Sequence, residues 1–164
     1  MRKYFFSIME NRIITAKIEV YQYSELLETD KILVERAKSA TKTSYSPYSK
    51  FQVGAALLLD NGEIVAGSNQ ENVAYPSGLC AERTVIFYAS ATYPGVKFKK
   101  LAIAAYTDGD FVEEPVSPCG ACRQSILEYE KLAGEPIEII LVGREKVYKI
   151  SGIRTLLPLS FEEF

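Results

Sequence analysis

Three cysteines are the side chains best suited to chemistry in this sequence, and they fall in two short segments. Cys80 lies in "YPSGLCAERTV", two residues before Glu82, while Cys119 and Cys122 lie in "SPCGACRQ". The chain contains no histidine, which excludes Ser-His-Asp and Cys-His arrangements for nucleophilic catalysis. Three cysteines cannot all pair with one another, so a disulfide framework of the secreted type is not expected.

Both cysteine segments stand where helices are expected to begin. Cys80 follows the turn "YPSG", Cys119 follows a proline that favours helix entry, and Cys122 lies one turn further on the same face. The positive end of the helix dipole lowers the pKa of a thiol placed there. Two such helix starts facing each other would gather three thiolates. Three thiolates with an open fourth position form a catalytic zinc arrangement, because closed structural sites use four protein ligands.

Charged neighbours of the cysteines have roles in such a site. Three thiolates leave the metal with a net negative charge, which weakens it as a Lewis acid. Arg83 and Arg123 each follow a cysteine segment and could donate a hydrogen bond to a thiolate. Glu82 is too close to Cys80 in sequence to be an obvious fourth ligand, but it is well placed to accept and pass on protons.

The same residues also fit less specific sites. They could be buried cysteines without a metal, a redox pair in "PCGAC", or a structural zinc site with Glu82 or another residue as fourth ligand. Glu82 by itself could simply be a carboxylate that favours the helix dipole. The redox interpretation leaves Cys80 and Glu82 without a role. The joint presence of C-x-E and P-C-x-x-C therefore favours catalytic zinc.

The rest of the chain alternates between strand and helix patterns. Residues 11–23 predict an extra strand, residues 28–43 an amphipathic helix, and "SYSPYSK" a turn. An Asn61-Gly62 hairpin then joins two apolar runs in "FQVGAALLLDNGEIVAGS". Further helices are predicted in "CAERTVIFYASATY" and "CRQSILEYEKLAG", and further strands in "LAIAAYTD", "IEIILVG" and "KVYKIS". This order predicts a layered α/β domain with one mixed sheet. We expect residues 1–24 to form an N-terminal extension and residues 25–164 a catalytic domain.

Bulk properties narrow the class of protein. The 164 residues suit a single domain, and a net charge of −2 argues against a surface that binds nucleic acid. No apolar run approaches the roughly 18 residues of a membrane span, and the apolar part of "MRKYFFSIMENR" is too short for a signal peptide. Together with unpaired cysteines, this composition predicts a cytoplasmic protein that binds neither nucleic acid nor membrane.

Four segments together resemble the zinc-dependent cytidine deaminases. They are "SYSPYSKFQVGAAL", "NQENVAYPSGLCAER", "SPCGACRQ" and "LLPLSF". The general zinc-deaminase signature includes a three-cysteine variant with a glutamate that is not a ligand. The resemblance implies a three-layer α/β/α sandwich with a mixed five-stranded sheet and an assembly of four identical subunits with shared active sites. It also implies hydrolytic deamination of free cytidine and deoxycytidine in pyrimidine salvage, with one zinc ion per subunit.

The resemblance also assigns a role to each matching residue. It implies that Cys80, Cys119 and Cys122 hold zinc and that Glu82 moves protons. It implies that Asn69 and Glu71 contact the ribose and that Phe51 forms a wall of the nucleoside pocket. The Ala81 backbone N–H is expected to meet the pyrimidine carbonyl. Tyr75 and Phe161 are expected to enter a neighbouring subunit's site, where Phe161 stacks on the base.

Three other functions compete with this one. A deaminase of another aminoheterocycle, such as blasticidin S, shares C-A-E and P-C-x-x-C-R-Q, although the N-x-E motif and "LLPLSF" favour cytidine. Deaminases of nucleic acid bases usually place histidine in the first zinc motif and need a basic channel. A non-catalytic zinc-binding module would bind the metal without releasing ammonia.

Overall fold

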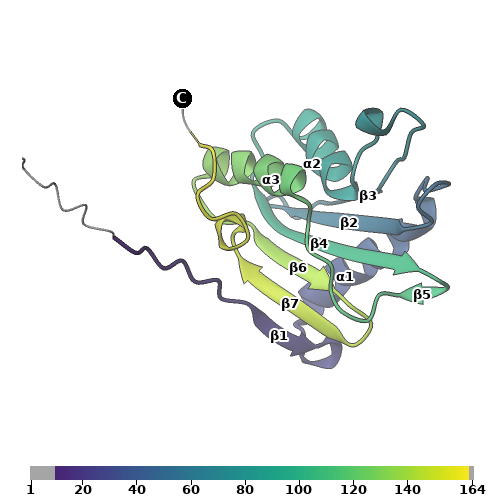
Figure 1. Ribbon diagram of the computed structural model, residues 1–164, viewed down its shortest axis with the longest axis horizontal. Coiled ribbons are helices and arrows are strands. Elements are labelled where there is room, and N and C mark those ends of the chain that lie inside the picture. The colour runs from purple at the N-terminus through teal and green to yellow at the C-terminus, as the bar shows by residue number, and fades with distance from the viewer. Residues whose placement is uncertain (1–9, 163–164) are drawn as a thin grey trace, which may run out of the picture.

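A mixed β-sheet forms the middle layer of the protein. The structure is a computed structural model that describes residues 10–162. Within these residues the strand order is β1-β7-β6-β4-β2-β3, with β5 paired to β4 (Figure 1). The strands β4 and β6 are parallel, whereas each other pair of neighbours is antiparallel. The seven strands are β1 (Glu19–Gln22), β2 (Gln52–Leu59), β3 (Ile64–Ser68), β4 (Phe98–Thr107), β5 (Asp110–Phe111), β6 (Glu138–Val142) and β7 (Lys146–Ser151).

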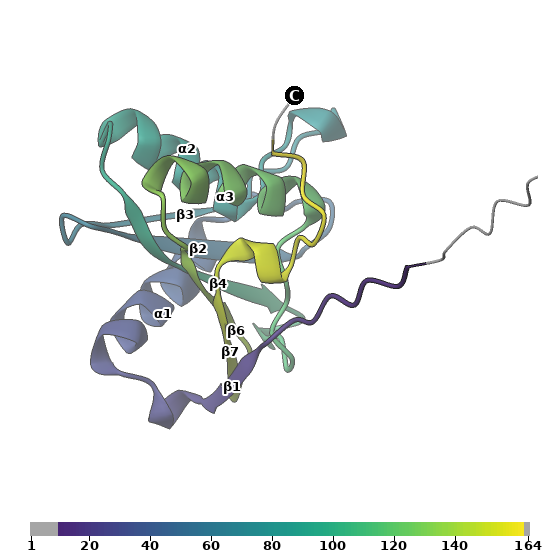
Figure 2. The same ribbon diagram turned by 90° about the vertical axis from the view of Figure 1, so that its left-hand side faces the viewer.

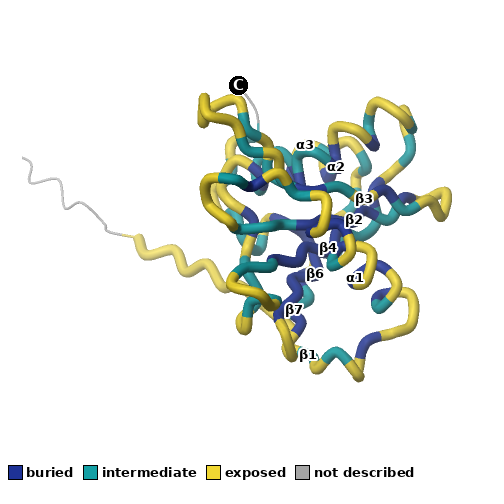
Figure 3. Tube along the Cα trace, turned by 90° about the vertical axis from the view of Figure 1, so that its right-hand side faces the viewer, coloured by how far each residue is buried: buried dark blue, intermediate teal, exposed yellow. Residues whose placement is uncertain are grey.

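Helices cover both faces of this sheet. Helix α1 (Glu28–Ala40) lies on one face, and α2 (Ala81–Thr92) and α3 (Gly120–Ala133) lie together on the other (Figure 2). Alternate side chains of each strand point to opposite faces, so the central strands contribute to two separate cores. The central strands form the most buried part of the trace in Figure 3. Leu57, Leu101 and Ile139 pack with α2 and α3, and Ala56, Ala102 and Ile140 pack with α1.

The expected three-layer α/β/α arrangement and the order of its main elements are confirmed. Across residues 10–162, however, the sheet has seven strands instead of five. One addition is the predicted N-terminal strand, which is shorter than residues 11–23 because β7 offers pairing partners only to Glu19–Gln22. The other is β5, a two-residue strand that was not predicted because so short a segment carries no period-2 pattern. The division at residue 24 stays a prediction.

Two local boundaries also differ from the sequence pattern. The first helix ends at Ala40, and its last predicted turn is a 3₁₀ helix, Thr41–Thr43. The hydroxyls of Thr41 and Thr43 donate to backbone carbonyls three residues back, which competes with a continued α-helix. The predicted hairpin forms, but of its two turn residues only Gly62 has a positive φ, at 87°. No helix in the described part of the chain has the length and apolar character needed to cross a bilayer.

Close packing of α1 on β2 positions the loop that enters the candidate site. A Cβ atom on Gly54 would lie 2.1 Å from the Ala37 carbonyl oxygen and 2.6 Å from the Thr41 nitrogen. Only glycine therefore fits at this place. The loop of residues 44–51 leaves this contact and forms one wall of the pocket described next.

Candidate active site and metal centre

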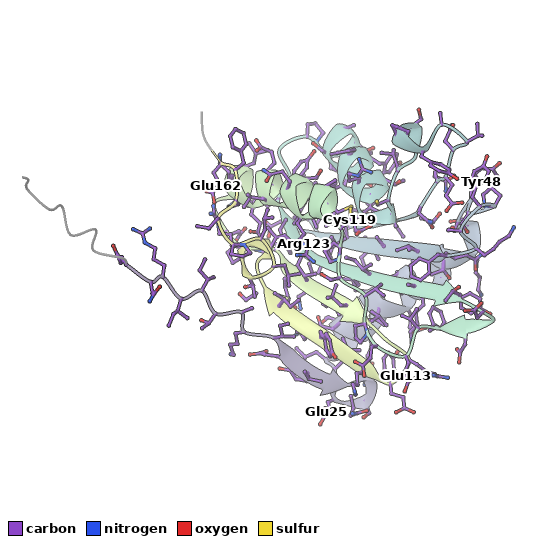
Figure 4. The ribbon with its side chains drawn as sticks, viewed as in Figure 1. Glu25, Tyr48, Glu113, Cys119, Arg123 and Glu162 are labelled. Carbon is purple, nitrogen blue, oxygen red and sulfur yellow. The ribbon has the colours of Figure 1, made fainter. Side chains whose placement is uncertain are left out.

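The N-termini of α2 and α3 bring the three cysteines together. Cys80 is the N-cap of α2, Cys119 is the N-cap of α3, and Cys122 lies in the first turn of α3. Figure 4 labels Cys119 at this end of α3. The Cys80 and Cys119 sulfurs are 3.8 Å apart, and all three sulfurs lie within 4.8 Å of one another. None of the three takes part in a disulfide.

This geometry fits a zinc ion. Tetrahedral ligands with zinc–sulfur bonds of about 2.3 Å lie about 3.8 Å from one another, which matches the Cys80–Cys119 separation. Among the described residues, the cluster that could hold a metal contains the three cysteines and no carboxylate. Glu82 is thus not a member of the ligand group, and a fourth position stays open for water or substrate.

The charge in the cluster is concentrated on Cys80. A hydrogen bond from the Cys122 thiol and another from Arg83 lower the pKa of Cys80 to about 5. The Arg83 Nη2 atom lies 3.7 Å from the Cys80 sulfur, and its Nε is buried without a hydrogen-bond partner among the described residues. Cys122 has a raised pKa because it donates to Cys80 and is buried near Glu82. Binding of a divalent cation would allow all three sulfurs to lose their protons.

Glu82 is buried beside these sulfurs. Its side chain is 4% exposed, and burial, followed by the negative charge of Cys80, raises the pKa of its carboxyl group. A carboxyl group with a raised pKa is suited to take up and release protons near neutral pH. Glu82 also lines the pocket that opens beside the cysteine cluster.

A pocket of about 770 Å³ lies against the cluster. Its volume falls within the range of small-molecule sites. It contains most of the residues predicted to bind a nucleoside. The lining residues that the sequence predicted are Phe51, Asn69, Glu71, Tyr75, Cys80, Ala81, Glu82, Arg83 and Cys119.

Asn69 is held in one orientation by the loop that follows α1. Its Oδ1 accepts hydrogen bonds from the Ser44 hydroxyl at 2.5 Å and the Val53 N–H at 2.8 Å. Its Nδ2 donates to the Phe51 carbonyl at 2.9 Å. The amide nitrogen has a second hydrogen that these contacts leave available. Asn69 is therefore prepared to donate one hydrogen bond to a ligand hydroxyl.

Glu71 is fixed by the same loop. Its Oε2 accepts hydrogen bonds from the Tyr48 N–H at 2.9 Å and the Ser49 N–H at 3.3 Å. A hydrogen bond from the Ser49 side chain, together with these two N–H groups, lowers the pKa of Glu71. Glu71 is therefore an ionised acceptor at neutral pH, a suitable partner for a sugar hydroxyl.

Phe51 and Ala81 line the pocket from two separate segments of the chain. Phe51 is half-buried directly before β2, and Ala81 is fully buried as the first residue of α2. The first backbone N–H groups of a helix have no partner within it, so the Ala81 N–H can meet a ligand acceptor.

Tyr75 and Phe161 lie at the surface. Tyr75 is 78% exposed at the pocket mouth and packs edge-on against Tyr48, with ring centroids 6.2 Å apart. Phe161 is 66% exposed near the end of the chain and is not among the described residues that line this pocket. Its carbonyl accepts a hydrogen bond from Gln124 in α3. The structure therefore places Phe161 outside this pocket.

Arg123 does not make the contact with a sulfur that the sequence suggested. Within the described chain, its hydrogen bonds go to the Pro118 carbonyl, the Leu156 carbonyl and the Ser117 hydroxyl. The α-helix directs this side chain back over the preceding turn, toward the backbone before Cys119. Arg83 alone donates to a thiolate among these two arginines.

Sequence reasoning missed the residues that hold the side chains of Asn69 and Glu71 in place. Ser44, Tyr48 and Ser49 belong to "SYSPYSK", which predicts only a turn. The richness of that turn in hydroxyl groups and its position before a buried strand were the available signals. Their partners, Asn69 and Glu71, lie more than 20 residues away in sequence, so the pairing itself was not readable.

Comparison with known protein families shows which family this chain belongs to. The model of the "Cytidine and deoxycytidylate deaminase zinc-binding region" matches residues 27–133. The chain belongs to this family. The cysteine cluster lies within the matched region, and the zinc ion that the family name implies agrees with the geometry of the three sulfurs.

Individual relatives in the cytidine deaminase family support the same conclusion. A cytidine deaminase from Sporosarcina psychrophila is 50% identical over 138 residues, covering 84% of this chain and 93% of that protein. The crystal structure of cytidine deaminase from Burkholderia pseudomallei is 38% identical with a TM-score of 0.68, covering 80% of this chain and 98% of that one. The cytidine deaminase structure from Mycobacterium tuberculosis is 34% identical with a TM-score of 0.65, covering 84% and 99%.

Proposed function

We propose that this protein is a hydrolase that converts cytidine and deoxycytidine to uridine and deoxyuridine, consuming water and releasing ammonia. The observation that carries this proposal is the three-sulfur cluster with buried Glu82 at one end of a pocket lined by Asn69 and Glu71. The pocket thus combines a metal site, a proton carrier and hydrogen-bonding groups for a sugar. The general role of such a reaction is pyrimidine salvage.

Zinc held by Cys80, Cys119 and Cys122 would supply Lewis acidity and lower the pKa of water at its open position. Glu82 accepts the proton that water loses and transfers it to N3 of the pyrimidine ring. The water oxygen forms a bond to C4, Glu82 carries that oxygen's second proton to the amino group, and the C4–N bond breaks to release ammonia. Its buried position and raised pKa suit both transfers, because the carboxyl group can be either donor or acceptor.

The nucleoside is oriented by residues around the pocket. Asn69 donates to a ribose hydroxyl and Glu71 accepts from one. The Ala81 N–H meets the pyrimidine carbonyl, and Phe51 packs against the nucleoside. These contacts place C4 beside the open zinc position and within reach of Glu82.

The charges in the pocket favour a free nucleoside over a nucleotide. The charged residues that line it are Glu71, Glu82 and Arg83, and Arg83 already donates to Cys80. A 5′-phosphate would thus meet two acidic groups, while the arginine among the described lining residues is already engaged by Cys80. The family name covers both cytidine and deoxycytidylate, so this distinction has to be measured.

One assay tests the substrate. Purified zinc-loaded protein is incubated separately with cytidine, deoxycytidine, deoxycytidine monophosphate, adenosine and blasticidin S, and ammonia and ultraviolet absorbance are followed. We expect turnover of the first two only. Turnover of blasticidin S without turnover of cytidine would contradict the proposal, and zinc binding without ammonia from any substrate would identify a non-catalytic module.

We further propose an assembly of four identical subunits in which Tyr75 and Phe161 contribute to a neighbour's site. Both side chains are exposed in the single subunit, at 78% and 66%, as residues that serve another subunit would be. Three cysteines without a disulfide are typical of a reducing compartment, which supports a cytoplasmic enzyme.

A further inference from the structure

Arg123 joins two segments that are far apart in the sequence. Its Nε donates to the Pro118 carbonyl at 2.8 Å, and its Nη2 donates to the Ser117 hydroxyl at 2.9 Å. Its Nη1 donates to the Leu156 carbonyl at 2.7 Å. One guanidinium group therefore binds both the loop that ends at Cys119 and the start of the C-terminal segment, residues 156–162.

The loop contacts bear directly on a metal ligand. The Pro118 carbonyl belongs to the peptide unit that enters Cys119, so a hydrogen bond to it restrains the backbone that carries the Cys119 sulfur. Cys119 is exposed, and the N-terminus of α3 has no side-chain cap. The planar, rigid fork of Arg123 supplies the fixed direction that this helix start otherwise lacks.

The C-terminal segment depends on the same helix. Residues 156–162 contain no helix or strand, and contacts with α3 hold them in place together with the ion pair of Arg154 and Glu162. The Gln124 Nε2 atom donates to the Phe161 carbonyl at 2.8 Å, and Lys131 donates to the Glu162 carbonyl. Figure 4 shows Arg123 near Cys119 at the first turn of α3 and Glu162 beside its other end.

We propose that Arg123 is a positioning residue that couples the metal loop to the C-terminal segment. In this proposal, zinc binding orders the backbone around Cys119 and so fixes the positions of the Ser117 and Pro118 acceptors. Arg123 can then bind both acceptors and the Leu156 carbonyl at the same time. The C-terminal segment is then held more firmly when zinc is bound. Because this segment carries Phe161, the catalytic consequence rests on the proposed function, whereas the coupling itself does not.

Hydrogen exchange measures this coupling without any substrate. Backbone exchange of residues 156–162 is compared in the zinc-loaded and zinc-stripped full-length protein, for the wild type and for Arg123→Ala. In the wild type we expect exchange to rise at least about fivefold when zinc is removed. In Arg123→Ala the exchange should be fast in both states, with a zinc effect below about twofold. A residue that merely stabilises the fold would leave the zinc effect intact.

Zinc release provides a second readout. Transfer of zinc to a coloured chelator should be about 10- to 100-fold faster in Arg123→Ala. Mutation of residues that orient metal ligands typically weakens metal affinity by about that factor. Gln124→Ala is the matched control, because Gln124 is the next residue and its hydrogen bond within the described chain goes to the C-terminal segment and not to the loop that ends at Cys119. It should speed exchange near Phe161 and leave zinc release within about twofold of the wild type.

Arg123→Lys keeps the charge and protects the test against misfolding of the alanine variant. Its single ammonium group can reach one of the two segments at a time, so the zinc effect on residues 156–162 should still be lost. The proposal is overturned if either Arg123 variant retains the zinc effect, or if Gln124→Ala releases zinc as fast as Arg123→Ala. If the wild type fails to deaminate cytidine but shows the coupling, the proposed function falls and this inference stands.

Discussion

Glu82 shows how the surroundings of one residue change the acidity of its side chain. On a solvated helix its carboxylate would only interact with the helix dipole, but here it is buried beside three sulfurs. Burial favours the neutral acid, and the nearby Cys80 thiolate acts in the same direction. These surroundings suit the proton transfers that we propose for Glu82, which lies outside the group of residues that could hold a metal.

We predict that Glu82→Gln loses at least about 10³-fold in kcat for cytidine, within the 10²–10⁴ range typical of general acid–base catalysis. The amide cannot take up a proton, whereas its size leaves the zinc site unchanged. Steady-state kinetics and metal analysis together test this. Glu63→Gln, on the exposed hairpin turn, is the control, and near-normal turnover by the Glu82 variant would contradict the assigned role.

We predict that Cys119→Ala loses bound zinc while keeping its fold. Removal of one of three sulfurs leaves only two ligands for a metal that prefers four. Metal content by mass spectrometry of the purified protein should fall below about a tenth of the wild-type value, with a normal circular dichroism spectrum. Ser125→Ala, one turn into the same helix, should keep full zinc. Full occupancy in the cysteine variant would refute this ligand set.

At the scale of elements, a network of charged side chains joins α1 to the sheet. Helix α1 is anchored to the sheet by Asp30, which is fully buried and forms ion pairs with Lys100 on β4 at 2.5 Å and Lys149 on β7 at 2.7 Å. Both lysines also contact Glu138 on β6. One carboxylate therefore connects α1 to non-neighbouring strands across the sheet.

The Asp30 network predicts a pH-dependent contribution to stability. Burial alone would raise the pKa of Asp30, but the two lysines outweigh it and lower the pKa below its ordinary value of 3.8. Because the folded-state pKa is lowered, the contribution is present above about pH 4 and is lost as the pH falls through the folded-state value.

Asp30→Asn should lower the free energy of unfolding at pH 7 by about 3 kcal/mol, since it leaves two lysines short of a partner. Urea denaturation at pH 7 and pH 3 tests this, with zinc conditions matched so that metal loss cancels between variants. The difference between wild type and variant should shrink at pH 3. A difference that is independent of pH would show that the ion pairs do not stabilise the fold, and Glu28→Gln on the exposed side of α1 is the control.

At the scale of the whole molecule, the single subunit has a pocket whose mouth is edged by the exposed ring of Tyr75. Phe161 lies on another part of the surface, held through its backbone by α3. The proposed assembly accounts for both, because Phe161 of one subunit would complete the pocket of the next.

We predict that Phe161→Ala raises the KM for cytidine about tenfold and changes kcat little, since base–aromatic stacking is worth about 1–3 kcal/mol. Leu159→Ala, in the same segment and 90% exposed, should leave KM unchanged. Light scattering should give four times the subunit mass for the wild type. A monomer with full activity would contradict shared sites.

Mixing two variants tests the sharing itself. Subunits with Glu82→Gln lack the proton carrier but retain Phe161. Subunits with Phe161→Ala retain the proton carrier but lack the aromatic ring. In mixed assemblies, sites with an intact Glu82 can receive Phe161 from a neighbour. We expect a fraction of sites with wild-type KM after mixing, and kinetics equal to the sum of the separate variants would refute the sharing.

The sequence by itself determined the reactive groups and their local geometry. Cys80 and Cys119 at helix starts, Cys122 one turn further, and Glu82 beside Cys80 follow from capping and from the 3.6-residue repeat, which act over a few residues. The apolar runs likewise determined the main strands, because the burial of alternate or continuous apolar side chains is encoded locally.

Only the tertiary structure decided which distant groups meet. The 3.8 Å approach of the Cys80 and Cys119 sulfurs, 39 residues apart in the chain, depends on α2 and α3 packing side by side on one face of the sheet. The orientation of Asn69 by Ser44 and the length of β1 have the same origin, since each depends on a partner far away in sequence. The sequence suggested a thiolate as the hydrogen-bond acceptor for Arg123, whereas the structure gives it two carbonyls and a hydroxyl. An arginine has several acceptors within reach, and the path of the backbone selects among them.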